Sequence, residues 1–272
     1  MPATGWAKEK LIWLLRDLPP LTIFEGSRKG QGAVDQMLAM LIEQMPEYDH
    51  GILRVNRARA LQMLQEHGFN CDPTLLWTPE RARFIHFSMP SMGTLSNGLV
   101  VRKQDQAMVA PFLVDGVVDL KALLASHPAR LGMVAERSYS TPIDGLLRET
   151  AADNLTPHYG SDAVRSLLQM QNLGRLKWLL AYWPEVRYLS QELGLPQDDL
   201  IFYPIQGVAN YQFIHVGCTD TPLGHEAVTR INQLLLNLRG TVLPPLYAQW
   251  LDPQMHDSYL EDARRFFEED AP

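Results

Sequence analysis

The sequence has no excess of basic residues and no long apolar run. Its 24 lysine and arginine residues are outnumbered by 31 aspartate and glutamate residues, which gives a formal net charge of −7 at pH 7. A chain with this charge is not expected to bind nucleic acid or an anionic membrane surface, although a local cationic cleft remains compatible with it. No uninterrupted apolar run approaches the ~20 residues that a membrane-spanning helix needs.

Cysteine is scarce, and common catalytic and metal-binding motifs are missing. Cys71 and Cys218 are the only cysteines, and neither belongs to a C-x-x-C or Cys/His pattern. We therefore expect no metal site. The sequence contains no G-x-S-x-G nucleophile motif and no H-E-x-x-H zinc motif. His86 and His225 are far apart in the sequence, and scattered histidines of this kind are usually structural. No catalytic residue and no cofactor are expected.

The sequence does contain two successive series of alternating strand and helix patterns. In the first series, strands are predicted at residues 10–15 and 52–55, and helices at 33–45 and 57–67. The second series predicts strands at 99–102, 130–135 and 176–182, and helices at 113–126, 141–150, 162–172 and 184–192. A strand at 213–216 and a long helix opened by Thr221 and Pro222 follow. Alternation of this kind favours parallel, doubly wound α/β sheets.

Residues 68–103 carry the most informative local pattern. Thr78 followed by Pro79 predicts the start of a short helix, because threonine caps helices well and proline suits the first helical position. Arg81 would then lie in the first helical turn, where the helix dipole disfavours a positive charge. An anionic partner for Arg81 is therefore expected. Spacing alone favours the ordinary alternative, an ion pair with a neighbouring carboxylate.

Residues 78–101, TPERARFIHFSMPSMGTLSNGLVV, resemble a characteristic stretch of the bacterial extracellular solute-binding proteins of family 3. In that family, a T-x-x-R…FS-x-P…LVV run leads from the first lobe into the second, and a weaker likeness extends along most of the chain. The resemblance implies a two-lobed periplasmic-binding-protein fold, in which each lobe is a doubly wound α/β sheet with flanking helices and the ligand cleft lies between the lobes. It assigns residues 1–91 and 211–272 to lobe 1, and residues 92–210 to an inserted lobe 2.

The resemblance also implies a function and a site. The expected function is non-catalytic capture of a small, carboxylate-bearing, amino-acid-like ligand for an ABC-type transporter. In the amino-acid-binding members, the arginine of the motif holds the ligand carboxylate through paired hydrogen bonds, and Arg81 occupies that position. The expected partners are this anionic small molecule and an inner-membrane permease or receptor, with the protein itself a monomer. The flanking site residues implied are Thr74, Leu76 and Thr78 in lobe 1, and Ser138 and Tyr139 in lobe 2.

Three positions depart from the amino-acid-binding pattern. Leu18 stands where those proteins have a stacking aromatic residue, and Leu76 stands where they have serine. Tyr182 falls where they have the acid that holds the ligand ammonium group. The carboxylate clamp is thus retained while the ammonium site is lost, which favours a carboxylate-bearing or aromatic ligand over a simple α-amino acid. Arg16, Asp17 and Glu25 lie in loops near the expected cleft and are candidates for replacement polar contacts.

Location and disulfide state also depend on the resemblance. The first ten residues lack the apolar segment of a signal peptide, which taken literally indicates a cytoplasmic protein. The resemblance instead implies a mature periplasmic chain whose leader has been replaced by Met1, and this is the location we expect. In the resembled fold, the strands that carry Cys71 and Cys218 are neighbours in lobe 1. A disulfide is therefore expected there, with two buried free thiols as the alternative.

Two other functions remain open on the same fold. One is a sensory or signalling module, in which ligand binding is reported to a receptor. The other is an enzyme of the dehydratase or lyase type, because a fold does not determine a function. Glu136 and Asp17 are the carboxylates that we would test for catalysis in that case.

Overall fold

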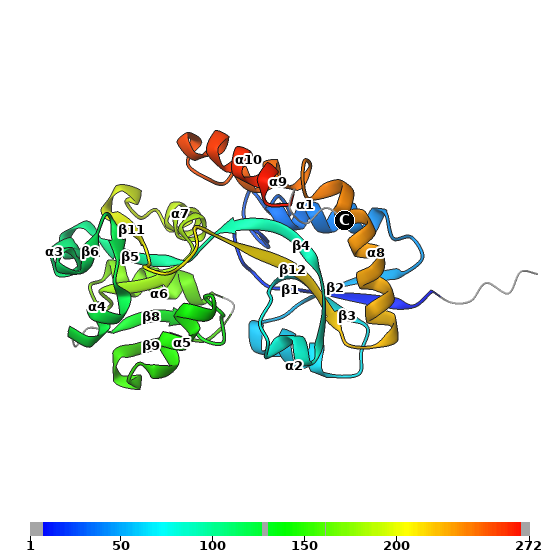
Figure 1. Cartoon of the computed structure of the whole chain (residues 1–272), viewed down its shortest axis with the longest axis horizontal. Helices are drawn as coiled ribbons and strands as arrows, with labels where there is room; N and C mark the ends of the chain where they lie inside the picture. The colour runs from blue at the N-terminus through cyan, green and yellow to red at the C-terminus, as the bar shows by residue number, and fades with distance from the viewer. Residues whose placement is uncertain (1–7, 127–129, 161, 268–272) are drawn as a thin grey trace, which may run out of the picture. The chain divides into compact units, whose positions relative to one another are not determined.

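The computed structural model describes residues 8–126, 130–160 and 162–267, which are drawn in colour in Figure 1. The chain divides into two compact units. Unit 1 comprises Met1–Asp17, Leu21–Gly93 and Phe213–Pro272, and unit 2 comprises Leu18–Pro20 and Thr94–Gln212. Each unit contains its own five-stranded sheet with flanking helices. Among the described residues, no helix is both long enough and apolar enough to cross a membrane.

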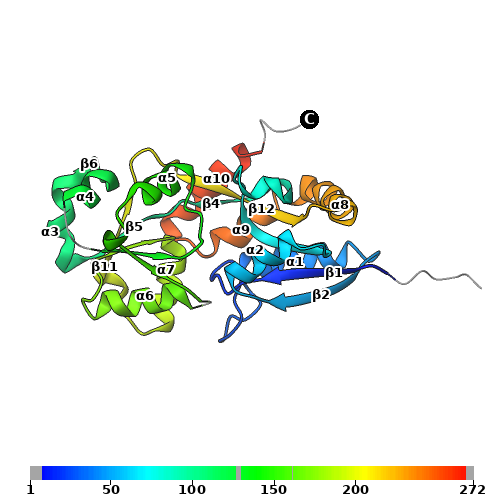
Figure 2. The same ribbon diagram turned by 90° about the horizontal axis from the view of Figure 1, so that it is seen from below.

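The sheet of unit 1 has the strand order β2-β1-β3-β12-β4. Its strands are β1 Lys10–Leu15, β2 Asp49–Arg54, β3 Asn70–Leu76, β4 Ile85–Leu95 and β12 Tyr211–Thr219. Its helices are α1 Ala33–Glu43, α2 Arg57–Gln65, α8 Pro222–Leu238, α9 Leu243–Ala248 and α10 His256–Arg265. Strand β1 is parallel to β2 and β3, whereas β12 is antiparallel to β3. Figure 1 shows α2 on one side of this sheet and α1 with α8 on the other, and Figure 2 gives the view from below.

Local sequence signals explain several of these elements. Strand β1 forms where predicted, and its Leu11, Trp13 and Leu14 side chains are fully buried. Helix α1 begins after Gly32, where the Asp35 carboxylate accepts the backbone N–H of Gly32 at 3.0 Å. Helix α8 begins as predicted at Thr221, whose side chain accepts the backbone N–H of Gly224 at 3.2 Å. Such caps satisfy backbone donors that a helix cannot pair internally.

Cys71 and Cys218 form a disulfide bond that joins β3 to β12. The two residues lie directly opposite each other in the antiparallel pairing of these strands, and both are fully buried. The expected disulfide is therefore confirmed.

The sheet of unit 2 has the strand order β11-β5-β10-β8-β9. Its strands are β5 Gly98–Arg102, β8 Leu131–Val134, β9 Leu155–His158, β10 Trp178–Ala181 and β11 Leu200–Pro204. Its helices include α4 Leu120–Ser126, α5 Thr141–Glu149, α6 Ala163–Asn172 and α7 Trp183–Glu192. Leu99 and Val101 of β5 pack into one apolar cluster, whereas Val100 packs into a second. This alternation shows that both faces of the sheet are covered, as in doubly wound folds.

Three features of the structure differ from what the sequence led us to expect. Residues 113–118 form a hairpin of β6 (Leu113–Val114) and β7 (Val117–Val118) instead of a helix, because Asp115 and Gly116 both adopt positive φ angles in the turn. Strand β4 runs unbroken from Ile85 to Leu95, and a strand of this length was not predicted. Strands β9 and β11, at the two edges of their sheet, were not predicted at all.

Candidate functional site

The first candidate feature is a buried polar cluster in unit 1 made of Arg16, Asp72 and Thr74. Arg16 directly follows β1, and its Nη2 donates to the Thr74 carbonyl at 3.2 Å, to the Thr74 hydroxyl and to Asp72 Oδ1 at 3.3 Å. Asp72 Oδ1 also accepts hydrogen bonds from the backbone N–H and the hydroxyl of Thr74, both at 2.8 Å. These contacts fix the orientation of the Arg16 guanidinium.

Arg16 retains donor groups that this cluster does not use. The Nε and Nη1 atoms of Arg16 are buried and make no hydrogen bond within the described parts of the chain. Arg16 is only 5% exposed and Asp72 is fully buried. Buried guanidinium N–H groups without partners are costly, so they mark a position where a further acceptor would be stabilised.

Arg81 lies at the same edge of the sheet. Its Nη1 donates to the Leu76 carbonyl at 3.0 Å, at the last residue of β3, and its backbone N–H donates to the Thr78 hydroxyl at 3.2 Å. Because β1 and β3 are parallel neighbours, the residues that follow them emerge at one common edge. Arg16 and Arg81 are therefore both presented at the carboxyl ends of these strands, and both side chains are buried.

The helix predicted at Thr78 is a single 3₁₀ turn, Arg81–Arg83. A turn this short has few aligned peptide dipoles, so the expectation that a helix dipole disfavours Arg81 is wrong. The N-cap residue of this turn is Glu80 and not the predicted Thr78, although the Thr78 hydroxyl accepts the Arg81 backbone N–H. Leu76 contributes its backbone carbonyl. The side chains of Thr78 and Leu76 are both half-buried.

In unit 2, Asp144 organises the segment that contains the predicted donors Ser138 and Tyr139. Ser138 Oγ donates to Asp144 Oδ2 at 2.5 Å, and the Tyr139 backbone N–H donates to Asp144 Oδ1 at 2.7 Å. The Tyr139 ring is fully buried, and its hydroxyl oxygen accepts the Val134 N–H at 2.7 Å. The Tyr139 side chain therefore belongs to the core, and a role of this residue in ligand binding stays a prediction.

A buried ion pair next to Tyr182 occupies the region where an ammonium-binding acid was considered. Arg137 donates from Nη1 and Nη2 to the two carboxylate oxygens of Glu185, at 2.7 and 3.0 Å. The Arg137 guanidinium also lies 5.5 Å from the centre of the Tyr182 ring. Burial alone lowers the pKa of Arg137, but the Glu185 carboxylate more than offsets it and raises the pKa overall. The Glu185 carboxylate thus holds Arg137 in its charged form.

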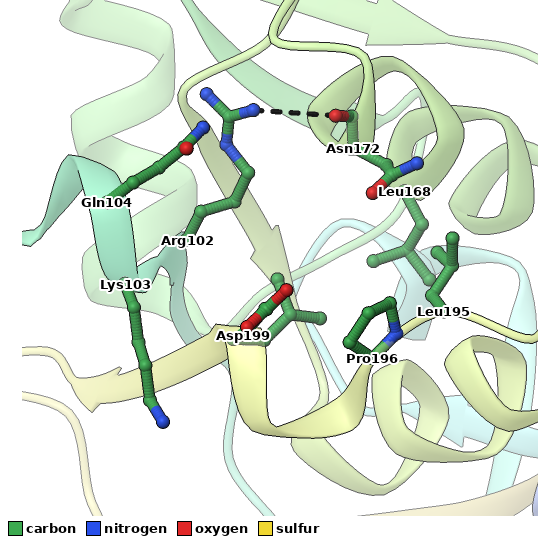
Figure 3. Close-up of a pocket in the computed structure, with 9 residues that line it drawn as sticks. Arg102, Lys103, Gln104, Leu168, Asn172, Leu195, Pro196 and Asp199 are labelled. Carbon is green, nitrogen blue, oxygen red and sulfur yellow. Dashed lines mark hydrogen bonds between the residues drawn. The ribbon is translucent and has the colours of Figure 1, made fainter.

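Unit 2 also contains a cavity of about 310 Å³ (Figure 3). Its lining residues are Arg102, Lys103, Gln104, Leu168, Asn172, Leu195, Pro196, Asp199 and Leu200. Arg102 Nε donates to Asp105 at 2.7 Å, and its Nη1 donates to the Asn172 carbonyl at 3.4 Å. Burial raises the pKa of Asp105, but hydrogen bonds from Lys177 and Arg102 lower it overall. The main cation of this cavity therefore already has a strong anionic partner.

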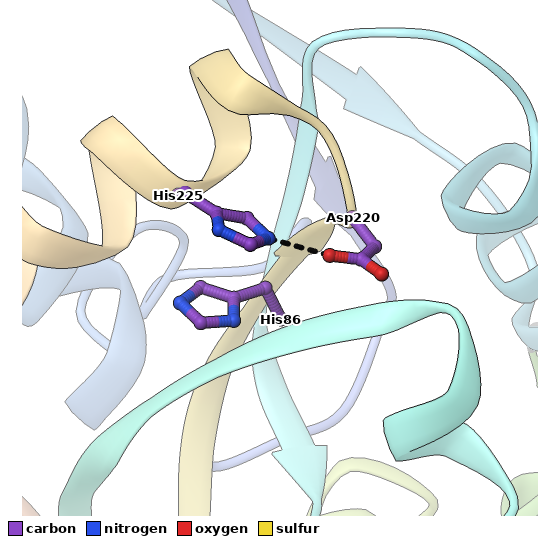
Figure 4. A group of neighbouring side chains, drawn as sticks. All are labelled: His86, Asp220 and His225. Atoms are coloured by element: carbon purple, nitrogen blue, oxygen red, sulfur yellow. Dashed lines mark hydrogen bonds and ion pairs between the residues drawn. The ribbon is translucent and has the colours of Figure 1, made fainter.

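Three side chains of unit 1 with metal-ligating groups converge at one place, namely His86, Asp220 and His225 (Figure 4). The two imidazole rings stack with their centroids 3.9 Å apart and an interplanar angle of 17°. His225 Nε2 lies 2.5 Å from Asp220 Oδ1. Burial and the neighbouring His225 lower the pKa of His86, while Asp220 acts in the opposite direction. The two histidines, which are far apart in the sequence, therefore lie together in the fold.

No family model and no curated protein matches the sequence. Similarity to solved structures is extensive. A histidine kinase sensor domain with similarity to periplasmic binding proteins matches with a TM-score of 0.69 and 15% identity, over 90% of this chain and 96% of that chain. An amino-acid ABC transporter substrate-binding protein from Streptococcus pneumoniae, bound to L-arginine, matches with a TM-score of 0.63 and 16% identity over 94% of each chain.

The chain has the periplasmic-binding-protein fold. Another structure with this fold is an ancestral amino-acid-binding protein, a precursor of cyclohexadienyl dehydratase, with a TM-score of 0.66 and 12% identity over 89% of this chain and 95% of that chain. The fold expected from the sequence resemblance is thereby confirmed.

Within this periplasmic-binding-protein fold, the predicted site residues fall into two groups. Unit 1 holds Arg16, Thr74, Leu76, Thr78 and Arg81, and unit 2 holds Leu18, Ser138, Tyr139 and Tyr182. Leu18 is buried. Sequence reasoning missed Asp72, Arg137, Asp144 and Glu185. An aspartate inside the otherwise buried β3 was a usable signal for Asp72, and an acid in the first turn of α5 was one for Asp144.

Proposed function

We propose that this chain is a non-catalytic solute-binding protein that captures a small carboxylate-bearing ligand for an ABC-type transporter. The observation that carries the proposal is the pair of buried arginines, Arg16 and Arg81, at the carboxyl ends of the parallel strands β1 and β3. Ligands of open α/β sheets bind beyond the carboxyl ends of the strands. Guanidinium groups at such an edge suit a planar carboxylate.

The two arginines differ in how they would serve a ligand. Arg16 is oriented by Asp72 and Thr74 and keeps its Nε and Nη1 donors unused within the described residues. Arg81 is anchored through the Leu76 carbonyl and the Thr78 hydroxyl. Anchoring of this kind lowers the ordering cost when a ligand binds, because the side chains already occupy defined positions.

The unit 2 residues support a ligand other than a simple α-amino acid. Tyr182 stands where an ammonium-binding acid is expected, and the nearby acid Glu185 is fully engaged by Arg137. The Ser138 hydroxyl donates a hydrogen bond to the Asp144 carboxylate. We therefore propose that recognition depends chiefly on the ligand carboxylate, with no dedicated contact to an α-ammonium group.

The proposed setting is the periplasm, with an inner-membrane permease as partner and a monomeric state. The buried disulfide between Cys71 and Cys218 supports an oxidising compartment. The similar protein from Streptococcus pneumoniae is described as a substrate-binding protein of an amino-acid ABC transporter.

A sensory module is the second candidate, because a histidine kinase sensor domain is among the similar structures. The two candidates share ligand capture and differ in the partner that reads the bound state. An enzyme on this scaffold would require turnover of the ligand, for which Glu136 and Asp17 remain the carboxylates to test. Glu136 is exposed and adopts a positive φ angle of 59°.

The deciding experiment is a thermal-shift screen of small carboxylic acids, amino acids and short peptides against the oxidised protein. Each hit is paired with its primary amide, which keeps size and shape but removes the negative charge. A ligand present at ~100 times its Kd should add about 2.7 kcal/mol to the free energy of unfolding. We expect the acids to stabilise the protein and the amides not to. Equal stabilisation by both members of each pair would refute carboxylate recognition, and turnover of a hit would favour the enzyme.

A further inference from the structure

We propose that His86, Asp220 and His225 form a binding site for a divalent transition-metal ion of the zinc class. One ligating atom from each of the three side chains lies within 4.8 Å of the other two. The site shares no residue with the proposed carboxylate site, so neither proposal depends on the other. Figure 4 shows the two rings stacked face to face with the Asp220 carboxylate at the ring nitrogen of His225.

The fold brings the three residues together through the pairing of β4 with β12. The Ser88 hydroxyl accepts from the Val216 N–H at 3.0 Å, and the Ser91 hydroxyl donates to the Ile214 carbonyl at 3.0 Å. As residue numbers rise along β4, those of its partners fall along β12, so the strands run antiparallel. The start of β4, which carries His86, therefore lies beside the end of β12, after which Asp220 follows at once.

The first turn of α8 places His225 against Asp220. A Cβ atom at Gly224 would lie 1.9 Å from the Thr219 carbonyl oxygen, so α8 can approach the end of β12 this closely only with glycine there. Thr221 caps the same turn by accepting the Gly224 N–H. The backbone that carries Asp220 and His225 is thus fixed before any ion binds, as a specific metal site requires.

The ligand set identifies the class of metal. Two imidazole nitrogens and one carboxylate oxygen suit zinc and related transition metals, whereas calcium and magnesium prefer oxygen ligands alone. Ligands bound to zinc at ~2.0–2.1 Å in a tetrahedron lie about 3.4 Å apart. This value lies between two distances in the cluster. His225 Nε2 is 2.5 Å from Asp220 Oδ1, and no two of the three ligating atoms are more than 4.8 Å apart. An imidazole binds a metal in its ring plane, so the two rings, now stacked at an interplanar angle of 17°, must rotate for both to bind the same ion.

The exposure of the cluster is compatible with ion entry. The side chains of His225 and Asp220 are 51% and 52% exposed, so an ion can arrive from solvent and keep a water molecule as its fourth ligand. The stacking keeps the two imidazole rings close together, with their centroids 3.9 Å apart.

The test uses the full chain, purified without a polyhistidine tag and freed of metal with a chelator. Zn²⁺ is titrated into it by calorimetry, and Co²⁺ is added in parallel because its visible absorption reports four-coordinate nitrogen and oxygen ligation. We expect one ion per chain and no competition from Mg²⁺ or Ca²⁺. His225→Gln and Asp220→Asn should each weaken Zn²⁺ binding by more than the ~10–100-fold typical of losing an outer-shell partner.

His67→Gln is the matched control, because His67 is an exposed histidine of the same unit that lies outside the cluster. It should leave both the stoichiometry and the Zn²⁺ affinity unchanged. Melting temperatures measured without metal confirm that each variant is folded. The proposal is overturned if the wild-type protein binds no Zn²⁺. It is equally overturned if His225→Gln and Asp220→Asn both bind Zn²⁺ as tightly as His67→Gln does.

Discussion

The ion pair between Arg137 and Glu185 allows a quantitative test of the interior of unit 2. The change is Glu185→Gln, which keeps the side-chain shape and removes the negative charge. Both partners are about nine-tenths or more buried, with side-chain exposures of 5% and 4%. The substitution therefore leaves a buried guanidinium without its counter-ion and replaces an oxygen acceptor by an amide donor. Losing one partner of such a buried pair costs roughly 3–5 kcal/mol.

The chain offers a matched exposed pair as the control. Arg59 and Glu66 approach to 3.3 Å, but their side chains are 47% and 49% exposed. Glu66→Gln should therefore cost about 0–1 kcal/mol, because solvent screens the charges and the pair contributes little. The same chemical change is thus compared in a buried and in an exposed environment.

The assay is urea unfolding at equilibrium, followed by circular dichroism and by tryptophan fluorescence, since two units can unfold separately. We expect Glu185→Gln to lower the melting temperature by on the order of 10 °C in a parallel thermal scan. Replacing both partners together, as Arg137→Met with Glu185→Leu, should recover most of the loss, because no charge then remains buried. The reasoning is refuted if Glu185→Gln costs no more than Glu66→Gln.

Three further predictions follow from other contacts. Reducing the Cys71–Cys218 disulfide should lower the free energy of unfolding by about 5 kcal/mol on the chain-entropy estimate, since it links positions 147 residues apart; two free thiols in the oxidised, folded protein would contradict this. Arg81→Ala should weaken binding of the identified carboxylate by roughly 2–5 kcal/mol, with Arg81→Lys intermediate. The control Arg83→Ala, at an exposed position, should leave the affinity unchanged. If Arg81→Ala instead lowers the stability strongly and leaves the affinity unchanged, Arg81 has a structural role. Gly224→Ala should lower the free energy of unfolding, measured with urea, by about 1–3 kcal/mol, because the added methyl group would clash with the backbone at the end of β12. A variant as stable as the wild type would argue against the close approach of α8 to β12.

Most elements with strong local signals could be predicted from the sequence. Strand β1 has a dense apolar pattern, and α8 has a cap, a proline and a long apolar stripe, so both were identified at their starts. Strand β9 contains Pro157 and has no fully buried residue, and its place depends on pairing with β8, which is distant in the sequence. Edge strands of this kind lack the alternation on which prediction depends.

The candidate sites were predicted less completely than the fold. Arg81 and Thr78 were found because a local motif carries them. The pairing of Arg137 with Glu185 joins side chains from separate parts of the chain, and no spacing in the sequence predicts it. The approach of His86 to His225 likewise depends on the pairing of β4 with β12. Side-chain partners of this type are decided by tertiary packing, which a single sequence does not display.

The disulfide has a consequence for the covalent connectivity of the chain. Cys71 and Cys218 close a ring, and the Thr94–Gln212 segment of unit 2 lies entirely inside it. A protease that cuts this segment once therefore opens the ring without dividing the molecule, and the two pieces stay covalently joined through sulfur. On a denaturing gel they should migrate together until a reductant is added. Two cuts within the ring would instead release the intervening peptide while leaving the strands of unit 1 tied to each other.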